Sequence, residues 1–174
     1  MNEKEKIRNM FLGFTLGDAL GVPYEFKSRS TMQKNPANEM TGFGTYAQPK
    51  GTWSDDSSLA LCLADSLCSG YNLVDIARYF VAWSKSEMWT ARGQVFDIGW
   101  HTRYSLNRLG SLLKRDLSDI TLLKYETDEK TNGNGSLMRI LPLLYFIKGK
   151  DINEQFQIVR DVSALTHGHI RAAI

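Results

Sequence analysis

The stretch GTWSDDSSLALCLADSL, residues 51–67, places two adjacent carboxyl groups directly ahead of an almost entirely apolar run. Ser54 suits a helix N-cap, and acidic residues in a first turn interact favourably with the helix dipole. The pattern therefore predicts a buried helix that starts at Ser54 and is stopped by Gly70. A second interpretation stays open, because carboxylate and hydroxyl oxygens are also the ligands of Mg²⁺. On that interpretation Ser54, Asp55 and Asp56 bind a metal ion, and a second acidic segment is needed for a two-metal site.

Helical periodicity extends over most of the chain. Apolar residues recur at three- and four-residue steps, and no stretch shows a convincing strand alternation. We therefore expect one all-α domain over residues 1–174, a compact multi-helix form with a long loop at about 22–53. Pro142 is expected to kink the helix that contains it. The other expected helices cover about residues 7–20, 73–83, 95–113 and 153–166.

Composition and charge describe an ordinary globular protein. The chain has 174 residues, 43% of them hydrophobic, and its net charge of +2 comes from scattered basic residues. Nucleic-acid-binding proteins usually cluster Lys and Arg on one face, so we expect no nucleic-acid partner. No apolar run approaches the roughly 18 residues that span a membrane, and the N-terminus lacks a signal-peptide core. Cys62 and Cys68 are expected to be reduced core residues of a cytoplasmic protein.

A glycine-rich segment, KTNGNGSLMR at 130–139, precedes another predicted helix. Gly133 and Gly135 permit positive φ, and free amides at a helix start can bind a diphosphate. The segment is equally consistent with a simple glycine turn that binds no ligand, because its spacing matches neither a P-loop nor a dinucleotide fingerprint.

Three further positions are ambiguous when each is taken singly. Asp97 is either a first-turn cap or a pocket carboxylate, and Glu25 is either a solvated loop acid or a catalyst. His167 and His169 follow an apolar helix, where the dipole favours histidine. With no nearby cysteine, this pair is not a convincing zinc site.

Taken in order, these segments resemble the ADP-ribosylglycohydrolase family, which includes dinitrogenase-reductase-activating glycohydrolase. The matching segments are GFTLGDALGVPYEF, GTWSDDSSLALCLADSL, FDIGWHTRYSL, NGNGSLMRILPL and SALTHGHIRAA, and together they extend over essentially the whole chain. The resemblance implies an all-helical fold, bound Mg²⁺ or Mn²⁺, and hydrolysis of the bond that joins ADP-ribose to a protein side chain or a small acceptor.

The resemblance also implies a role for each matching position. Ser54, Asp55 and Asp56 correspond to metal ligands, with Asp18 supporting them from the first helix. Glu25 corresponds to an acidic residue of a mobile loop near the ribose, and Asp97 to an aspartate at the reaction centre. The remaining matches, which would contact the ADP-ribose, are Gly133, Asn134, Gly135, Ser136 and His167.

One family motif has no counterpart in this sequence. Family members carry a later Asp-x-Asp motif that completes a dinuclear metal site, and no such motif occurs here. We therefore expect this sequence to be the N-terminal part of a family member, and its exposed apolar surface to be buried in a homodimer. Two alternatives to a hydrolase follow: a non-catalytic ADP-ribose- or metal-binding remnant, and a helical interaction module.

Overall fold

The computed structural model describes residues 1–115, 117–126, 128–129 and 132–172, and every regular element in these ranges is a helix. This confirms the predicted all-α fold. No helix in the described ranges is long and apolar enough to cross a membrane. The elements are α1 (Glu3–Gly21), η1 (Val22–Tyr24), α2 (Arg29–Lys34), α3 (Asp55–Leu67), α4 (Leu73–Ser86), α5 (Trp100–Leu112), η2 (Leu117–Tyr125), η4 (Leu137–Arg139), α6 (Leu143–Phe146), α7 (Ile152–Ala164) and η5 (Ile170–Ala172).

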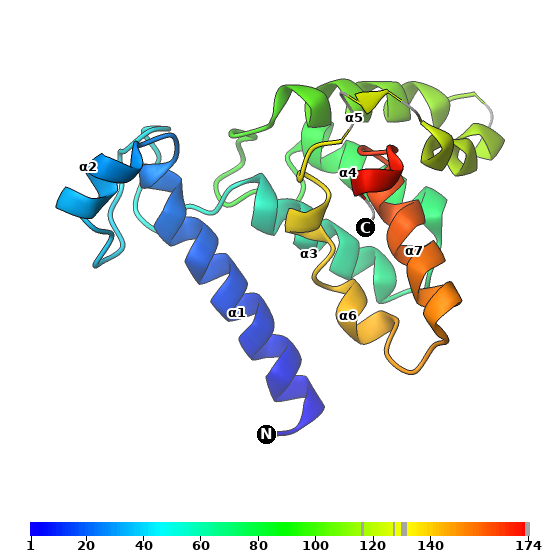
Figure 1. Cartoon of the computed structure of the whole chain (residues 1–174), viewed down its shortest axis with the longest axis horizontal. Coiled ribbons are helices and arrows are strands. Elements are labelled where there is room, and N and C mark those ends of the chain that lie inside the picture. Colours follow the sequence, from blue (N-terminus) through cyan, green and yellow to red (C-terminus); the bar gives the residue numbers. More distant parts are fainter. Residues whose placement is uncertain (116, 127, 130–131, 173–174) are drawn as a thin grey trace.

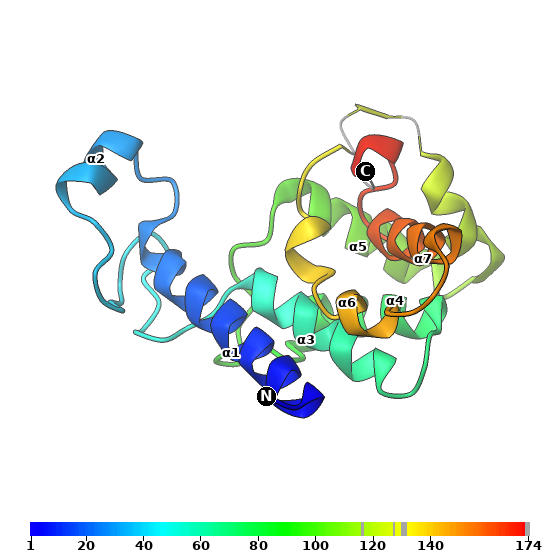
Figure 2. The same cartoon turned by 60° about the horizontal axis from the view of Figure 1, so that its bottom comes forward.

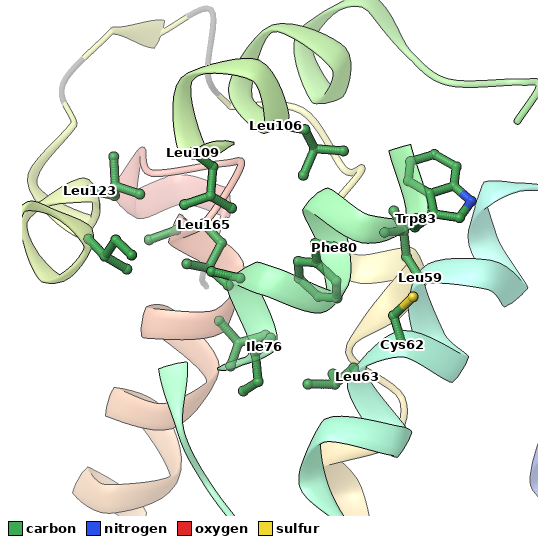
Figure 3. Close-up of a cluster of buried hydrophobic side chains, with 14 of the residues drawn as sticks. Leu59, Cys62, Leu63, Ile76, Phe80, Trp83, Leu106, Leu109, Leu123 and Leu165 are labelled. Atoms are coloured by element: carbon green, nitrogen blue, oxygen red, sulfur yellow. The ribbon is translucent and has the colours of Figure 1, made fainter. Parts of the chain in front are cut away.

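The hydrophobic core lies between α3, α4, α5 and α7 (Figure 3). Helix α4 is central, because its Phe80 and Trp83 side chains are both at most 1% exposed. Full burial of each such side chain contributes about 2 kcal/mol or more. The neighbouring elements contribute Leu59, Cys62, Leu63, Leu106, Leu109, Val162 and Leu165 to the same cluster.

Side-chain caps fix where the core helices begin. The side chain of Asn72 accepts a hydrogen bond from the Asp75 N–H at the start of α4, and Asp151 caps α7 in the same way. Ser54 is the N-cap of α3, as the sequence predicts, and its hydroxyl accepts from the Asp56 N–H at 3.4 Å. These caps satisfy amide groups that have no partner within their own helix.

Helices α1 and α2 lie to one side of this core (Figures 1 and 2). Of the α1 residues only Ala19 is buried, and the 22–53 segment that carries α2 extends away from the other helices. The segment for which a long loop is expected contains the two short helices η1 and α2.

Three local predictions are wrong. The fourth helix begins at Trp100 and not near Val95, because Asp97 takes a left-handed φ of 54° that an α-helix does not tolerate. Pro142 does not kink a continuous helix but stands between η4 and α6, where its missing N–H leaves no gap in a hydrogen-bond ladder. Cys68 is exposed, so only Cys62 belongs to the core.

Candidate functional site

The first helix holds the acidic end of α3 in place through Asp18. Its carboxylate accepts hydrogen bonds from the Ser54 N–H and hydroxyl, and from the Ser57 N–H at 3.0 Å and hydroxyl at 2.5 Å. The carboxylate therefore completes the N-terminus of α3 from outside the helix. This arrangement fixes the direction in which the neighbouring residues Asp55 and Asp56 leave the first turn.

Five carboxyl groups lie near one another at this end of the molecule. Burial, followed by the charges of Asp97 and Asp56, raises the pKa of Asp55 to about 9. Burial and the charges of Asp18 and Asp97 raise the pKa of Asp56 to about 6. Burial, a hydrogen bond with Asp97 and its charge raise the pKa of Glu25 to about 8. Such mutual repulsion creates a strongly anionic region that favours a bound cation or proton.

Tyr46 connects the two carboxyl groups that come from loops. Its hydroxyl donates a hydrogen bond to Oδ1 of Asp97 and lies 3.3 Å from Oε2 of Glu25. Its ring packs against Phe96, with 5.4 Å between the ring centroids. Burial and the two carboxyl groups raise the pKa of the Tyr46 hydroxyl, so this group stays protonated and can only donate one hydrogen bond at a time. The contact also joins the 22–53 segment to the loop before α5.

The glycine-rich segment lies against His167. A methyl group added to Gly135 would lie 2.9 Å from Cε1 of the imidazole, and one added to Gly133 would lie 3.3 Å from its Nε2. Nδ1 of His167 is hydrogen-bonded to Oγ1 of Thr166 at 2.8 Å. Burial, together with the charge of Arg139, lowers the pKa of His167 to about 3, so the ring is neutral at physiological pH.

Ser136 and Asn134 complete this segment. The Ser136 side chain is buried, and its hydroxyl accepts a hydrogen bond from the Ser163 hydroxyl of α7 at 2.8 Å. The Asn134 carbonyl accepts from the Leu137 N–H, which closes a turn, and its side chain is exposed. The element that follows is the three-residue η4 and not the predicted α-helix, so the segment has no α-helical N-terminus behind it.

Arg139 fastens the glycine-rich segment to the core. Its guanidinium is fully buried and donates hydrogen bonds to the carbonyls of Gly135, at 2.8 Å, and of Val162 and Ser163. It also lies over the ring of Phe80, 4.9 Å from the centroid. Burial lowers its pKa to about 9, while the charge of Asp55 acts in the opposite direction. Arg139 thereby holds the glycine-rich segment against the end of α7.

A short segment after α4 supports the approach to α3. The Trp53 indole N–H donates to the Trp89 carbonyl at 3.2 Å, and the Trp89 indole N–H donates to Asp65 of α3 at 3.0 Å. The Arg92 guanidinium donates to the Thr52 hydroxyl at 2.8 Å. These bonds hold the two residues that precede Ser54 against α3.

The structure thus gathers the candidate residues of the sequence into two groups. Glu25, Asp55, Asp56 and Asp97 lie in the acidic region together with Asp18. Gly133 and Gly135 lie beside His167, and Ser136 is hydrogen-bonded to Ser163. His169, in contrast, accepts local hydrogen bonds, from the Arg171 N–H at its Nδ1 and from the Ala172 N–H at its carbonyl. Periodicity and motif spacing did not single out Tyr46 or Arg139. One feature of the sequence pointed to Arg139. It is a charged residue that follows a glycine turn and an apolar pair, where an apolar residue would be expected.

The donor atoms of the acidic region suit a hard divalent cation, because they are carboxylate and hydroxyl oxygens. Burial and the charges of neighbouring carboxyl groups raise the pKa values of Asp55 and Asp56, and a bound cation would offset both effects. Within the described ranges, however, no three or more His, Cys, Asp or Glu side chains are grouped closely enough to hold a metal ion. The acidic region therefore offers oxygen donors, but the described residues do not form a complete metal site.

Comparison with known proteins gives one consistent result. The sequence model of the ADP-ribosylglycohydrolase family matches residues 1–174. ADP-ribosylarginine hydrolase Tri1 of Pseudomonas putida is 33% identical over 144 residues, and Tri1 of Serratia proteamaculans is 32% identical over 166 residues. The ADP-ribosyl-[dinitrogen reductase] glycohydrolase of Rhodospirillum rubrum is 29% identical over 163 residues.

A solved structure shares the fold. A chain of an ADP-ribosylglycohydrolase-related protein complex superimposes with a TM-score of 0.70 and 32% identity, over 94% of this chain and 50% of that chain. The matches to the three curated relatives cover 82%, 94% and 91% of this chain, but only 36%, 42% and 50% of the relatives. The chain therefore spans about half the length of the proteins it matches, or less.

Proposed function

Because the chain belongs to the ADP-ribosylglycohydrolase family, we propose that it takes part in removing ADP-ribose from a modified arginine side chain. Arginine is favoured over other acceptors because two relatives above 30% identity are named ADP-ribosylarginine hydrolases. The observation that carries the proposal is the contact of the Tyr46 hydroxyl with both Asp97 and Glu25, beside the acidic pair Asp55 and Asp56.

We propose that the two groups bind different parts of the substrate. The glycine-rich segment would accept the diphosphate with the backbone amides of its turn, while the Arg139 guanidinium holds that segment from behind through the Gly135 carbonyl. The buried, neutral His167 ring would support the glycine-rich segment from behind without adding charge. The ribose and its bond to the acceptor would then lie over the carboxyl groups of Glu25 and Asp97.

Cleavage needs one acid and one base. Glu25, with its pKa near 8, carries a proton at neutral pH and would donate it to the departing guanidine nitrogen. Asp97, which accepts a hydrogen bond from Tyr46, would take a proton from the water that attacks the anomeric carbon. The carbon–nitrogen bond breaks as the carbon–oxygen bond forms, and the products are ADP-ribose and the free side chain.

We further propose that Ser54, Asp55 and Asp56 hold Mg²⁺ or Mn²⁺. When bound, such an ion supplies positive charge that neutralises the acidic region and orients the ribose hydroxyls. The Ser54 hydroxyl donates to Asp18 and accepts from the Asp56 N–H, which leaves one oxygen lone pair for an ion.

The test is the release of ADP-ribose from an arginine-ADP-ribosylated protein, measured by chromatography with Mg²⁺ or Mn²⁺ present. We expect release by the wild-type chain, and loss of at least about 100-fold in Asp97→Asn and Glu25→Gln. Binding of ADP-ribose without release would show a non-catalytic binding protein. If the wild-type chain neither binds ADP-ribose nor releases it in the presence of either metal, the proposal is contradicted.

A further inference from the structure

Two side chains of α5 hold the corner of the chain that follows α7. Nε2 of His101 lies 2.8 Å from the carbonyl oxygen of Thr166, and Oγ of Ser105 lies 2.9 Å from the same oxygen. A carbonyl oxygen can only accept, so both side chains donate and Nε2 of His101 carries a proton. The two donors are four positions apart in α5, which places them on one face of that helix. Together they occupy both lone pairs of one carbonyl group in a buried residue.

The same corner carries His167. The Thr166 hydroxyl is hydrogen-bonded to Nδ1 of His167 at 2.8 Å, and both residues are at most 4% exposed. The rings of His101 and His167 meet edge to face, with 4.9 Å between their centroids. The position of the His167 ring therefore depends on α5 in two ways, through the backbone of Thr166 and through direct contact with His101.

The glycine-rich segment lies directly on the His167 ring. The ring is so close to Gly133 and Gly135 that a methyl group at either position would displace it. Thr102 of α5 also approaches this segment, because its Oγ1 would lie 3.3 Å from a methyl group added to Gly135. Arg139 fixes the segment through the Gly135 carbonyl, and α5 fixes the surface on which the segment lies.

A histidine in this place also has a purely structural explanation. Side chains just beyond the C-terminal end of a helix often donate to carbonyl groups that have no partner within the helix. The Ser105 hydroxyl alone would satisfy the Thr166 carbonyl, however, so the bond from His101 is not needed for that purpose. What the second bond adds is a fixed position for the residue that precedes His167.

We propose that His101 is a positioning residue for the diphosphate of ADP-ribose, acting through His167 without contacting the substrate itself. Its bond to Thr166 keeps the His167 ring against the glycine-rich segment, and the ring keeps the amides of that turn in an arrangement that accepts a diphosphate. Without this donor the ring can move, and the glycines have no side chains of their own to hold the turn. The inference rests on the proposed function, because it takes ADP-ribose as the ligand.

The experiment combines calorimetric titration with ADP-ribose and with ADP, and steady-state release of ADP-ribose from an arginine-ADP-ribosylated protein. His101→Phe keeps a ring but has no donor. It should weaken the binding of ADP-ribose and of ADP by the same factor of at least about 10-fold, because both ligands contain the diphosphate. KM should rise while kcat changes little, since Glu25 and Asp97 stay in place.

Two further variants separate the hydrogen bond from the ring. His101→Gln has no ring, but its amide nitrogen can donate to the Thr166 carbonyl, so it should recover most of the lost affinity. Ser105→Ala removes the other donor and should weaken binding at least about 3-fold. Ser111→Ala is its matched control, because this serine of α5 donates to the Asn107 carbonyl of its own helix, and it should bind as the wild type does.

The melting temperature of each variant without ligand shows whether the fold is kept. Equal affinities of His101→Phe and the wild type would overturn the inference and leave the proposed function standing. A fall in kcat as large as the rise in KM, or no recovery in His101→Gln, would show a structural role and would also overturn it. If His101→Phe does not fold, equal affinities of Ser105→Ala and Ser111→Ala would overturn it. A wild-type chain that neither binds nor releases ADP-ribose would overturn the proposed function, and this inference with it.

Discussion

The Asp18 carboxylate lies across the N-terminus of α3 and accepts a hydrogen bond from the Ser57 hydroxyl, with 2.5 Å between Oδ2 of Asp18 and Oγ of Ser57. A residue of the first helix thereby organises the first turn of the helix that carries the acidic pair. Because this pair of residues is 39 positions apart in the sequence, the bond also ties α1 to the core. The candidate metal ligands depend on it for their orientation.

Asp18→Ala should therefore destabilise the protein. Hydrogen bonds to a charged acceptor contribute about 1.5–3 kcal/mol each, and loss of one negative charge near Asp55 offsets part of this. We expect the free energy of unfolding, measured in urea, to fall by about 2 kcal/mol. Asp18→Asn should lose less, because its amide oxygen still accepts. An unchanged unfolding curve for Asp18→Ala would contradict this account of α3.

Stability should fall as the pH rises when no divalent ion is present. Between its ordinary pKa of 3.8 and about 9, Asp55 of the folded protein retains a proton that the unfolded chain has released. The folded state therefore binds more protons than the unfolded state in this window, and stability decreases with pH. We expect a lower melting temperature at about pH 8 than at about pH 5, measured by calorimetry. Millimolar Mg²⁺ or Mn²⁺ should raise it more at the higher pH.

Asp55→Asn should separate the effect of charge from that of shape. The amide keeps the size of the side chain but cannot ionise, so the melting temperature at about pH 8 without metal should rise. The response to Mg²⁺ or Mn²⁺ should be lost in the same variant. Asp65→Asn, on the same helix but bonded to Trp89, is the control and should respond to metal as the wild type does. A full metal response in Asp55→Asn would show that the ion binds elsewhere.

Gly135→Ala should disturb the glycine-rich segment more than Gly133→Ala. The added methyl group would lie 2.9 Å from the His167 ring in the first case and 3.3 Å in the second. We expect affinity for ADP-ribose, measured by calorimetry, to fall at least about 10-fold for Gly135→Ala, which is about 1.4 kcal/mol. The Gly133→Ala variant should lose less. Equal affinities for the two variants would mean that contact with His167 does not set the shape of this segment.

Arg139→Met should be among the most destabilising single changes. Three carbonyl groups, those of Gly135, Val162 and Ser163, would lose their buried donor. Breaking a buried charged network typically costs about 3 kcal/mol or more, measurable by urea unfolding. Arg139→Lys keeps the charge but has fewer donors in a different geometry, so it should fall between wild type and Arg139→Met. Equal stability of the wild type and both variants would show that the hydrogen bonds of Arg139 do not stabilise the fold.

The helices that the sequence predicts well are those with both a cap and an apolar face. α3, α4 and α7 begin close to their expected residues, because Ser54, Asn72 and Asp151 are strong N-caps before periodic runs. The segment before α5 is apolar enough to imitate a helix, yet Val95 packs on the core from a loop. The left-handed φ of Asp97 prevents a helix from starting at Val95. Aspartate adopts this conformation more often than most residues do, but its presence in a sequence predicts it only weakly.

The candidate site was predictable at the level of motifs and not at the level of contacts. Acidic residues are common in catalytic and metal-binding sites, so the sequence alone could point to Glu25, Asp97 and the pair Asp55 and Asp56. Tyr46 lies in a stretch without periodicity, and its role depends on Glu25 and Asp97, from which it is separated by 21 and 51 positions. In the sequence, Arg139 is indistinguishable from an ordinary charged residue, because its role depends on carbonyl groups of α7 that only the fold brings next to it.

The two hydrogen-bonded tryptophans beside α3 have an optical consequence. Trp53 stands directly before Ser54, and its indole is bonded to Trp89, whose own indole is bonded to Asp65. Neutralising the carboxyl groups next to Trp53 would change the electric field around the indole. The intrinsic fluorescence of the unlabelled protein can therefore report the arrival of a cation or substrate in real time, without an added dye.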